Sequence, residues 1–131
     1  MRGVDTNILV RFLTGDDAAQ TERVDQLLES ADRTGERLRI DGIVLCELVW
    51  VLRSAYDASR AEIGELLARL IRSRQFLVDD RDSVNAALTA YRTGRGDFSD
   101  YLIGERNHRA GCRSTTTFDR ALTDSPRFEV L

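Results

Sequence analysis

Residues 38–52 read LRIDGIVLCELVWVL, and this stretch decides the fold class. Its first three residues favour a short strand, and the apolar residues that follow at helical spacing predict a helix from about residue 43 to 55. A strand followed by an amphipathic helix is also predicted at residues 1–4 and at residues 76–78. Short strands that alternate with amphipathic helices are typical of an α/β fold with a mostly parallel sheet and helices on both faces.

The remaining segments continue this alternation along the chain. Apolar residues from Val24 to Ala31 predict a helix that ends near Gly35, and the capping box Ser59–Glu62 predicts the start of another. The other predicted elements are helices at 8–13, at 84–91 and from about 99, a glycine loop at 93–97, and strands at 113–117 and 128–131. We expect a single three-layer α/β/α domain that spans residues 1–131, built on a short and mostly parallel central sheet.

The composition excludes several classes of protein. The 131 residues include 22 acidic and 19 basic ones, so the net charge is −3 and no general basic surface for nucleic acid is expected. Every basic residue is an arginine, and without lysine neither a P-loop nor a Schiff-base mechanism is available. The single histidine, His108, excludes a zinc site built on several histidines. Any contact with nucleic acid is therefore expected to be local or bridged by metal ions.

The expected location of the chain is the cytoplasm. Its longest apolar runs are too short to cross a bilayer, and no basic-then-apolar leader opens the sequence. The two cysteines, Cys46 and Cys112, do not make a disulfide framework. These features predict reduced thiols and no membrane partner.

Four acidic residues lie at positions where solubility alone does not explain a carboxylate. Asp5 and Asp119 directly follow predicted strands, and sites in parallel α/β sheets form beyond the carboxyl ends of strands. Asp100 opens the helix after the glycine loop, and Asp97 comes three residues earlier. Carboxylates are favoured at a helix N-terminus, so the alternative for Asp97 and Asp100 is simple capping.

Glu47 is the most informative acidic residue. It lies three residues after Val44 and four before Val51, which predicts that it shares their core-facing stripe. A carboxylate on such a stripe is costly unless it is paired or bound to a metal, and the alternative is a glutamate at the stripe edge that reaches solvent. Trp50 on the same helix is predicted to lie in the core or at an interface.

Clustered carboxylates repel one another unless one takes up a proton or all share a cation. Because histidine and thiolate clusters are absent, the cation that fits is one that prefers oxygen ligands, Mg²⁺ or Mn²⁺. Such ions can hold a phosphodiester and activate a water, and they let an acidic protein bind a polyanion.

Four segments together resemble the motifs of PIN domains. Residues 4–9, VDTNIL, resemble the first motif, and Glu47 with the residues after it resembles the second. Residues 97–103, DFSDYLI, resemble the third motif, and residues 115–121, TTTFDRA, resemble the fourth. Order and spacing agree along nearly the whole chain, and the similarity extends to the VapC-like toxins of toxin–antitoxin pairs.

The resemblance implies a metal-dependent endoribonuclease. The acids that it implies as ligands of Mg²⁺ or Mn²⁺ are Asp5, Glu47, Asp100 and Asp119, with Asp97 as an accessory acid. The residues implied to orient these acids or their waters are Thr6, Asn7 and Thr117. Ordinary turn and cap chemistry is the alternative for these three.

The implied reaction is hydrolysis of an RNA phosphodiester by an activated water, which leaves a 5′-phosphate and a 3′-hydroxyl. The implied substrates are structured RNAs, tRNA or a ribosomal RNA loop. The implied partners are a small antitoxin that covers the site and a second copy of the chain in a homodimer. Tyr101 is bulky where related sequences often have a small residue, which predicts a different pocket wall.

Two arginines are candidates for contacts with RNA, and two other functions compete with the ribonuclease. Arg92 and Arg95 flank the glycine loop and are candidates for RNA-phosphate contacts, with a solvated surface as the alternative. One competing function is a non-catalytic PIN-like interaction module whose acids dock a basic partner. The other is a haloacid-dehalogenase-like phosphatase with Asp5 as nucleophile, but such enzymes need a second aspartate at the position that Asn7 occupies.

Overall fold

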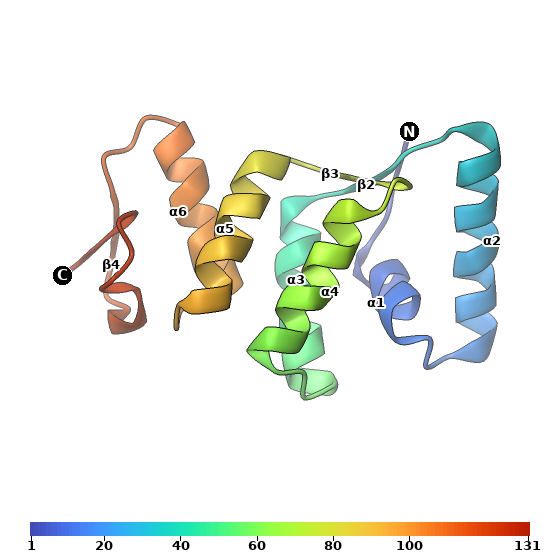
Figure 1. Cartoon of the computed structure of the whole chain (residues 1–131), viewed down its shortest axis with the longest axis horizontal. Coiled ribbons are helices and arrows are strands. Elements are labelled where there is room, and N and C mark those ends of the chain that lie inside the picture. Colours follow the sequence, from blue (N-terminus) through green and yellow to red (C-terminus); the bar gives the residue numbers. More distant parts are fainter. The chain divides into compact units, whose positions relative to one another are not determined.

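The computed structural model describes all residues from 1 to 131 and consists of short strands and longer helices in alternation (Figure 1). The chain divides into two compact units, Met1–Asp79 and Asp80–Leu131, which we call the first and the second unit. None of the helices has the length and the apolar character that crossing a membrane requires.

The first unit is a parallel sheet with four helices. Its elements in chain order are β1 (Arg2–Gly3), α1 (Thr6–Thr14), α2 (Ala18–Thr34), β2 (Leu38–Ile40), α3 (Gly42–Ala55), α4 (Arg60–Arg72) and β3 (Phe76–Val78). The strands pair in parallel in the order β1-β2-β3, with Leu38 opposite both Arg2 and Phe76. This confirms the strands predicted at 38–40 and 76–78 and the helix predicted at 43–55.

Local signals in the sequence set the helix boundaries of the first unit. Asp17 accepts a hydrogen bond from the Gln20 amide at 3.0 Å at the start of α2, and Gly35, with φ of 72°, ends that helix. The Ser59 hydroxyl accepts from the Glu62 amide at 3.1 Å, and the Glu62 carboxylate accepts from the Ser59 amide at 3.2 Å. The predicted capping box is therefore confirmed.

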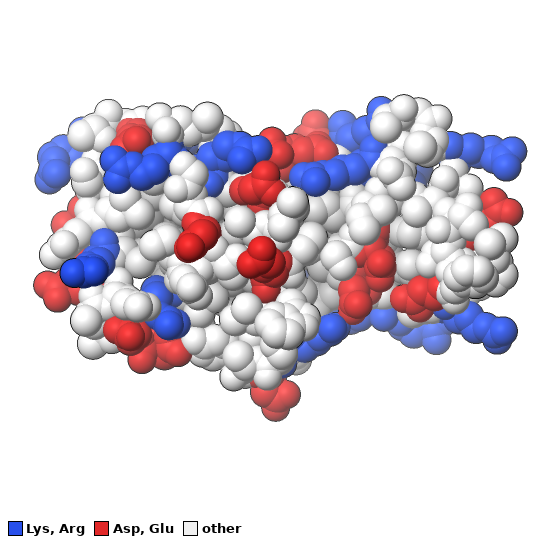
Figure 2. All heavy atoms as spheres, turned by 180° about the vertical axis from the view of Figure 1, so that it is seen from behind, with Lys and Arg blue, Asp and Glu red and all other residues white.

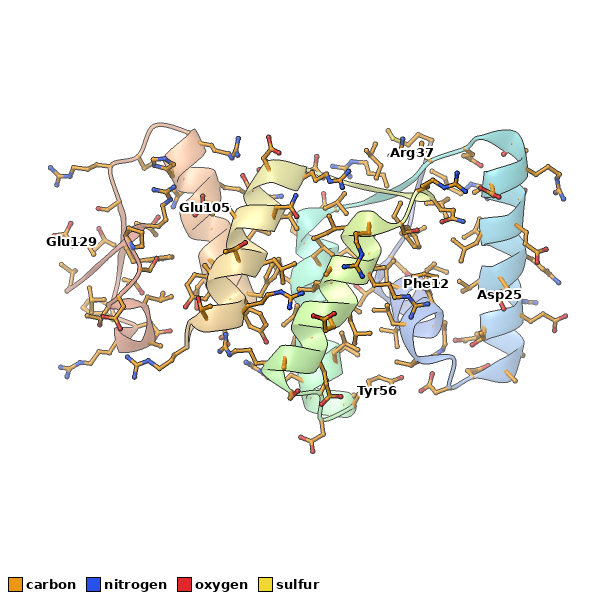
Figure 3. The ribbon with its side chains drawn as sticks, in the orientation of Figure 1. Phe12, Asp25, Arg37, Tyr56, Glu105 and Glu129 are labelled. Atoms are coloured by element: carbon orange, nitrogen blue, oxygen red, sulfur yellow. The ribbon has the colours of Figure 1, made fainter.

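Aromatic and apolar side chains hold the helices of the first unit against the sheet. Leu38 and Ile40 of β2 are fully buried, and α3 buries Leu45 and Leu48. The rings of Phe12 and Phe76 meet edge to face with centroids 5.2 Å apart, and the Arg69 guanidinium lies 4.7 Å over the Phe12 ring (Figure 3).

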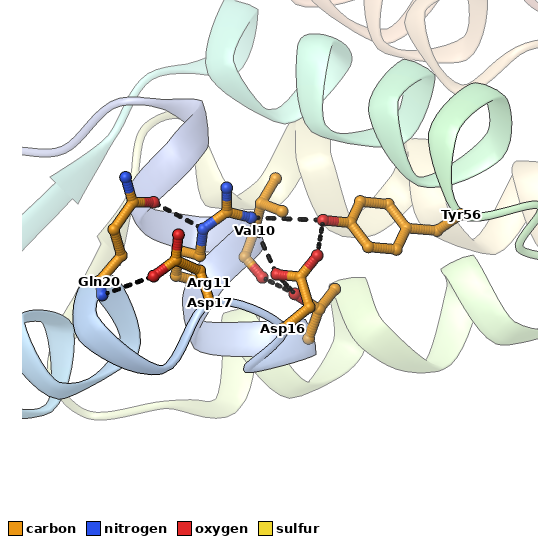
Figure 4. Close-up of polar contacts among 7 residues, drawn as sticks. Val10, Arg11, Asp16, Asp17, Gln20 and Tyr56 are labelled. Atoms are coloured by element: carbon orange, nitrogen blue, oxygen red, sulfur yellow. Dashed lines mark hydrogen bonds and ion pairs between the residues drawn. The ribbon is translucent and has the colours of Figure 1, made fainter.

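A polar network ties the α1–α2 turn to the end of α3 (Figure 4). The Asp16 carboxylate accepts hydrogen bonds from the Tyr56 hydroxyl at 2.5 Å and from the Thr14 hydroxyl at 2.9 Å, and it pairs with Arg11 at 2.9 Å. Arg11 also donates to Gln20 on α2 at 2.7 Å. The Tyr56 and Thr14 hydrogen bonds, and then the Arg11 charge, lower the pKa of the Asp16 carboxyl.

The second unit is a helical hairpin followed by a two-stranded sheet. It contains α5 (Arg81–Thr93), α6 (Phe98–Arg109), β4 (Thr115–Thr117), the short 3₁₀ helix η1 (Arg120–Leu122) and β5 (Phe128–Val130). The rings of Tyr91 and Phe98 meet edge to face between α5 and α6, 6.1 Å apart. The strands predicted at 113–117 and 128–131 are present, and they pair with each other in parallel rather than with the three-stranded sheet.

The C-terminal segment is anchored on α6. Arg127 pairs with Glu105 on this helix at 3.1 Å (Figure 3). Gly104, one residue earlier, is buried, and a Cβ on it would lie 2.7 Å from the ring of Phe128. The missing side chain therefore lets β5 approach the helix.

Candidate active site

Asp5 begins the candidate site in the first unit. It follows β1 after one intervening residue and is the N-cap of α1, where its Oδ1 accepts from the Ile8 amide at 3.4 Å. Its side chain is exposed. Asn7, on the first turn of α1, lines a cavity of about 290 Å³ together with Asp5 and Arg11.

Thr6 links this helix start to the second predicted acid. Its hydroxyl donates to Glu47 Oε2 at 3.0 Å, across 41 positions of sequence. Thr6 is buried, with 9% of its surface exposed, so its backbone and side chain are fixed by their surroundings. The contact brings the residue next to Asp5 against the acid on α3, and no local sequence signal could have revealed a pairing over this distance.

Glu47 does not lie on the core-facing stripe of α3, and that prediction was wrong. The helix buries Leu45, Leu48, Val49 and Leu52, whereas Glu47 is exposed. Its neighbours on its own face are Ile43, 67% exposed, and Trp50, 65% exposed, so Trp50 is not a core residue either. The helix turns its fully apolar side inward and leaves a carboxylate between two apolar side chains at the surface, which avoids burying a charge.

The second unit brings three other acids into electrostatic contact. Asp97 is the N-cap of α6, Asp100 lies in its first turn, and Asp119 follows β4. Partial burial raises the pKa of the Asp100 carboxyl above its ordinary value, and the negative charges of Asp97 and Asp119 raise it further. A backbone hydrogen bond from Asp97 acts in the opposite direction.

The capping roles fall on other residues than expected. Asp97 makes no side-chain capping bond to α6, although capping was its predicted alternative. Asp119, in contrast, caps η1, where its Oδ1 accepts from the Ala121 amide at 2.9 Å. The Thr117 hydroxyl accepts from the Asp119 amide at 3.0 Å, so Thr117 shapes the turn that presents this carboxylate.

The two candidate RNA-binding arginines lie at the end of α5 and in the glycine loop that follows it. Arg92 is in the last turn of α5 and Arg95 in the loop, and both are exposed. On the face that Figure 2 shows, arginine and acidic side chains are interspersed, as the net charge of −3 leads one to expect. Contact with a polyanion on this face would have to be local.

The donors available for a cation are carboxylate oxygens. No group of three or more His, Cys, Asp or Glu side chains in the structure is arranged to hold a metal ion. The exposed Asp5 and Glu47 carboxylates, like those of Asp97, Asp100 and Asp119, are nevertheless of the chemical type that Mg²⁺ and Mn²⁺ prefer. The donor set fits such an ion and does not fit zinc or a soft metal.

Comparisons with known proteins identify the family. A family model described as PIN domain matches residues 4–126, a range that includes parts of both units. A protein named VapC ribonuclease, from Aquifex aeolicus (strain VF5), is 28% identical over 120 residues, which cover 92% of this chain and 88% of that protein. These matches confirm the predicted resemblance and the α/β fold class, and they give no support to the phosphatase alternative. The chain belongs to the PIN domain family.

Proposed function

We propose that the protein is a metal-dependent endoribonuclease and the toxin of a toxin–antitoxin pair, folded as a single PIN-type domain over residues 1–131. The carboxylates that we assign to the site are Asp5, Glu47, Asp100 and Asp119, with Asp97 as an accessory acid. Support for RNA as the substrate comes from the relative named VapC ribonuclease, which matches over most of both chains.

The observation that carries the proposal is the raised pKa of Asp100, a partly buried carboxyl within electrostatic reach of Asp97 and Asp119. Partial burial, and then the negative charges of Asp97 and Asp119, raise the pKa of the Asp100 carboxyl, so its ionised form is disfavoured in the folded protein. Such an arrangement is disfavoured in a protein that has no use for it, and a bound cation would relieve the repulsion. Perturbed carboxyl groups of this kind are concentrated at functional sites.

Mg²⁺ or Mn²⁺ held by these acids would supply positive charge for the phosphodiester and lower the pKa of a water. The chain's own residues prepare the site. Thr6 holds the Glu47 carboxylate through the 3.0 Å hydrogen bond, and Thr117 holds the turn before Asp119. Arg92 and Arg95 are the candidates for contacts with RNA phosphates outside the acids.

A cognate antitoxin is the partner that we propose for the exposed face of α3. Ile43, Glu47 and Trp50 are spaced so that they share one face of this helix, and two of the three are large apolar side chains left in water. A protein covering this face would bury apolar surface and Glu47 at once, which would block the site. A homodimer and a cytoplasmic location complete the proposal.

The test is cleavage of labelled total RNA, and of a tRNA panel, by purified protein in Mg²⁺, Mn²⁺ or EDTA. We expect discrete fragments with 5′-phosphates that require the metal. Asp5→Asn should abolish them, because the neutral amide lacks the negative charge with which a carboxylate holds a divalent cation. Asp25→Asn, at an exposed acid on α2, is the matched control and should cleave at the wild-type rate (Figure 3).

The interaction module is the function that a negative result would favour. Well-folded protein that cleaves no RNA in either metal, yet binds a small basic partner through Asp5 and Glu47, would contradict the nuclease assignment. Wild-type cleavage by Asp5→Asn would contradict the assignment of the acids while leaving a nuclease in place.

A further inference from the structure

The loop between α5 and α6 is held by a side chain from the helix that follows it. The loop consists of residues 94–96, and Asp97 then caps α6. The Tyr101 hydroxyl accepts a hydrogen bond from the Gly96 amide at 3.1 Å. The bond is buried, and Tyr101 is only 5% exposed, so the phenol is the partner that satisfies this amide in the folded protein.

Close approach of side chains explains both glycines of the loop, with the Tyr101 phenol nearest at Gly94 and the Leu122 side chain nearest at Gly96. A Cβ on Gly94 would lie 2.0 Å from the Tyr101 hydroxyl oxygen and 2.8 Å from the Ala90 carbonyl. A Cβ on Gly96 would lie 2.4 Å from the Leu122 side chain and 3.2 Å from the Tyr101 ring. Gly94 has φ of −91°, which any residue can adopt, so close approach and not backbone conformation explains the glycine there.

The loop fixed in this way carries two candidate site residues. Arg95 lies between the two glycines, and Asp97 directly follows Gly96. Tyr101 itself directly follows Asp100 on α6. One side chain therefore sets the loop backbone on both sides of Arg95 relative to the helix that presents Asp100.

A cavity lies beside the loop, and Arg95 lines it. Its volume is about 360 Å³, and its walls include Arg95, Tyr101 and Ser125. Arg95 is exposed at this cavity and offers a planar, charged donor set of the kind that binds phosphate. Because the loop forms one wall, a loop that shifts would change both the direction of Arg95 and the shape of the cavity.

We propose that Tyr101 is a positioning residue that clamps the 94–97 loop so that Arg95 and Asp97 are held for the RNA substrate. The inference rests on the proposed ribonuclease function. It assigns to Tyr101 no contact with the reacting atoms. Its effect on the reaction is exerted through the loop.

The test compares Tyr101→Phe with Tyr56→Phe. The first removes the hydroxyl that binds Gly96 and keeps the ring, and the second removes a hydroxyl that binds Asp16, within the first unit. In metal-free protein, amide hydrogen exchange at Gly96, measured by NMR, should be about tenfold faster in Tyr101→Phe because one buried hydrogen bond is lost. It should be unchanged in Tyr56→Phe.

RNA kinetics provide the functional readout. We expect Tyr101→Phe to raise KM for RNA about fivefold, with a smaller change in kcat, since Arg95 is the loop residue aimed at phosphate. Tyr56→Phe should leave KM unchanged even if its melting temperature falls as far as that of Tyr101→Phe. Unchanged Gly96 exchange in Tyr101→Phe, or unchanged KM with faster exchange, would overturn the proposal. Wild-type protein that cleaves no RNA would refute the ribonuclease function instead, and Gly96 exchange would still decide whether the clamp exists.

Discussion

Thr6→Val removes the one hydrogen bond that connects the start of α1 to Glu47. The replacement keeps the volume of the side chain and leaves no unsatisfied donor, because valine has none. The lost bond is 3.0 Å long and its acceptor is a carboxylate. Bonds to charged groups contribute about 1.5–3 kcal/mol, but Glu47 is exposed and can accept from water instead, so we take a loss of about 1 kcal/mol.

That loss is expected to appear mainly in catalysis. If the bond holds Glu47 in its working rotamer, a loss of about 1 kcal/mol corresponds to about a fivefold fall in kcat/KM, since 1.36 kcal/mol is a factor of ten. Stability should fall by no more than about 1 kcal/mol, because Thr and Val have similar helix propensities at this first helical position.

The assay is RNA cleavage under single-turnover conditions in Mn²⁺, together with thermal unfolding in EDTA. Thr6→Ser is the matched control, because it keeps the hydroxyl and loses only a methyl group. We expect Thr6→Ser to cleave close to the wild-type rate and Thr6→Val to cleave more slowly. Equal rates for Thr6→Val and wild type would refute the argument that this contact positions Glu47, and equal losses in both variants would assign the effect to packing.

Three further outcomes follow from the structure. The folded-state pKa of Asp100 is raised, so its contribution to stability is present at low pH and is lost as the pH rises through that pKa. In thermal scans without metal, Asp100→Asn should therefore melt at a higher temperature than wild type at pH 7, and the difference in melting temperature should close towards pH 3. The folded-state pKa of Asp16 is lowered, so its contribution to stability is present at neutral pH and is lost as the pH falls. Asp16→Asn should therefore destabilise the protein more at pH 7 than at pH 3, and an equal loss of stability at both pH values would contradict the network in Figure 4. Gly104→Ala should lower the free energy of unfolding by about 1 kcal/mol in urea titrations, because the clash with Phe128 at 2.7 Å outweighs a gain of about 0.5–1 kcal/mol in helix propensity; a more stable variant would show that the ring moves aside freely.

Most of the fold could be predicted because its signals are local. The helix that ends at Gly35, the capping box at Ser59 and the strand at 38–40 each depend on a few adjacent residues, and all three are confirmed. Strand pairing depends on distant segments. The strands near residues 115 and 128 were found from their composition, but their pairing with each other, apart from β1 to β3, has no local signature.

The side-chain contacts of the candidate site were harder to predict. The stripe that placed Glu47 in the core was drawn through Val44, Leu48, Val51, Leu52 and Ala55. Leu48 and Leu52 are buried as expected, but Val44 and Val51 are only half-buried, and the buried side of α3 centres on Leu45, Leu48 and Leu52. The two interpretations share Leu48 and Leu52 and differ by a rotation of the helix about its axis, and a helix this apolar permits either. In the structure the leucines of α3 are buried, and Glu47 lies at the surface with Trp50.

Capping and metal binding were posed as alternatives for Asp97 and Asp100, and the caps at Asp5 and Asp119 show why the two roles need not exclude each other. Asp5 and Asp119 each use Oδ1 to accept one backbone amide. A carboxylate has two oxygens and about four lone-pair sites, so the cap fixes the side chain while the other oxygen remains available to a cation. Asparagine caps a helix about as well as aspartate but ligates a divalent cation poorly, whereas alanine does neither. Substitution by asparagine at Asp5 and Asp119 should therefore separate catalysis from folding, and the alanine variants confound the two.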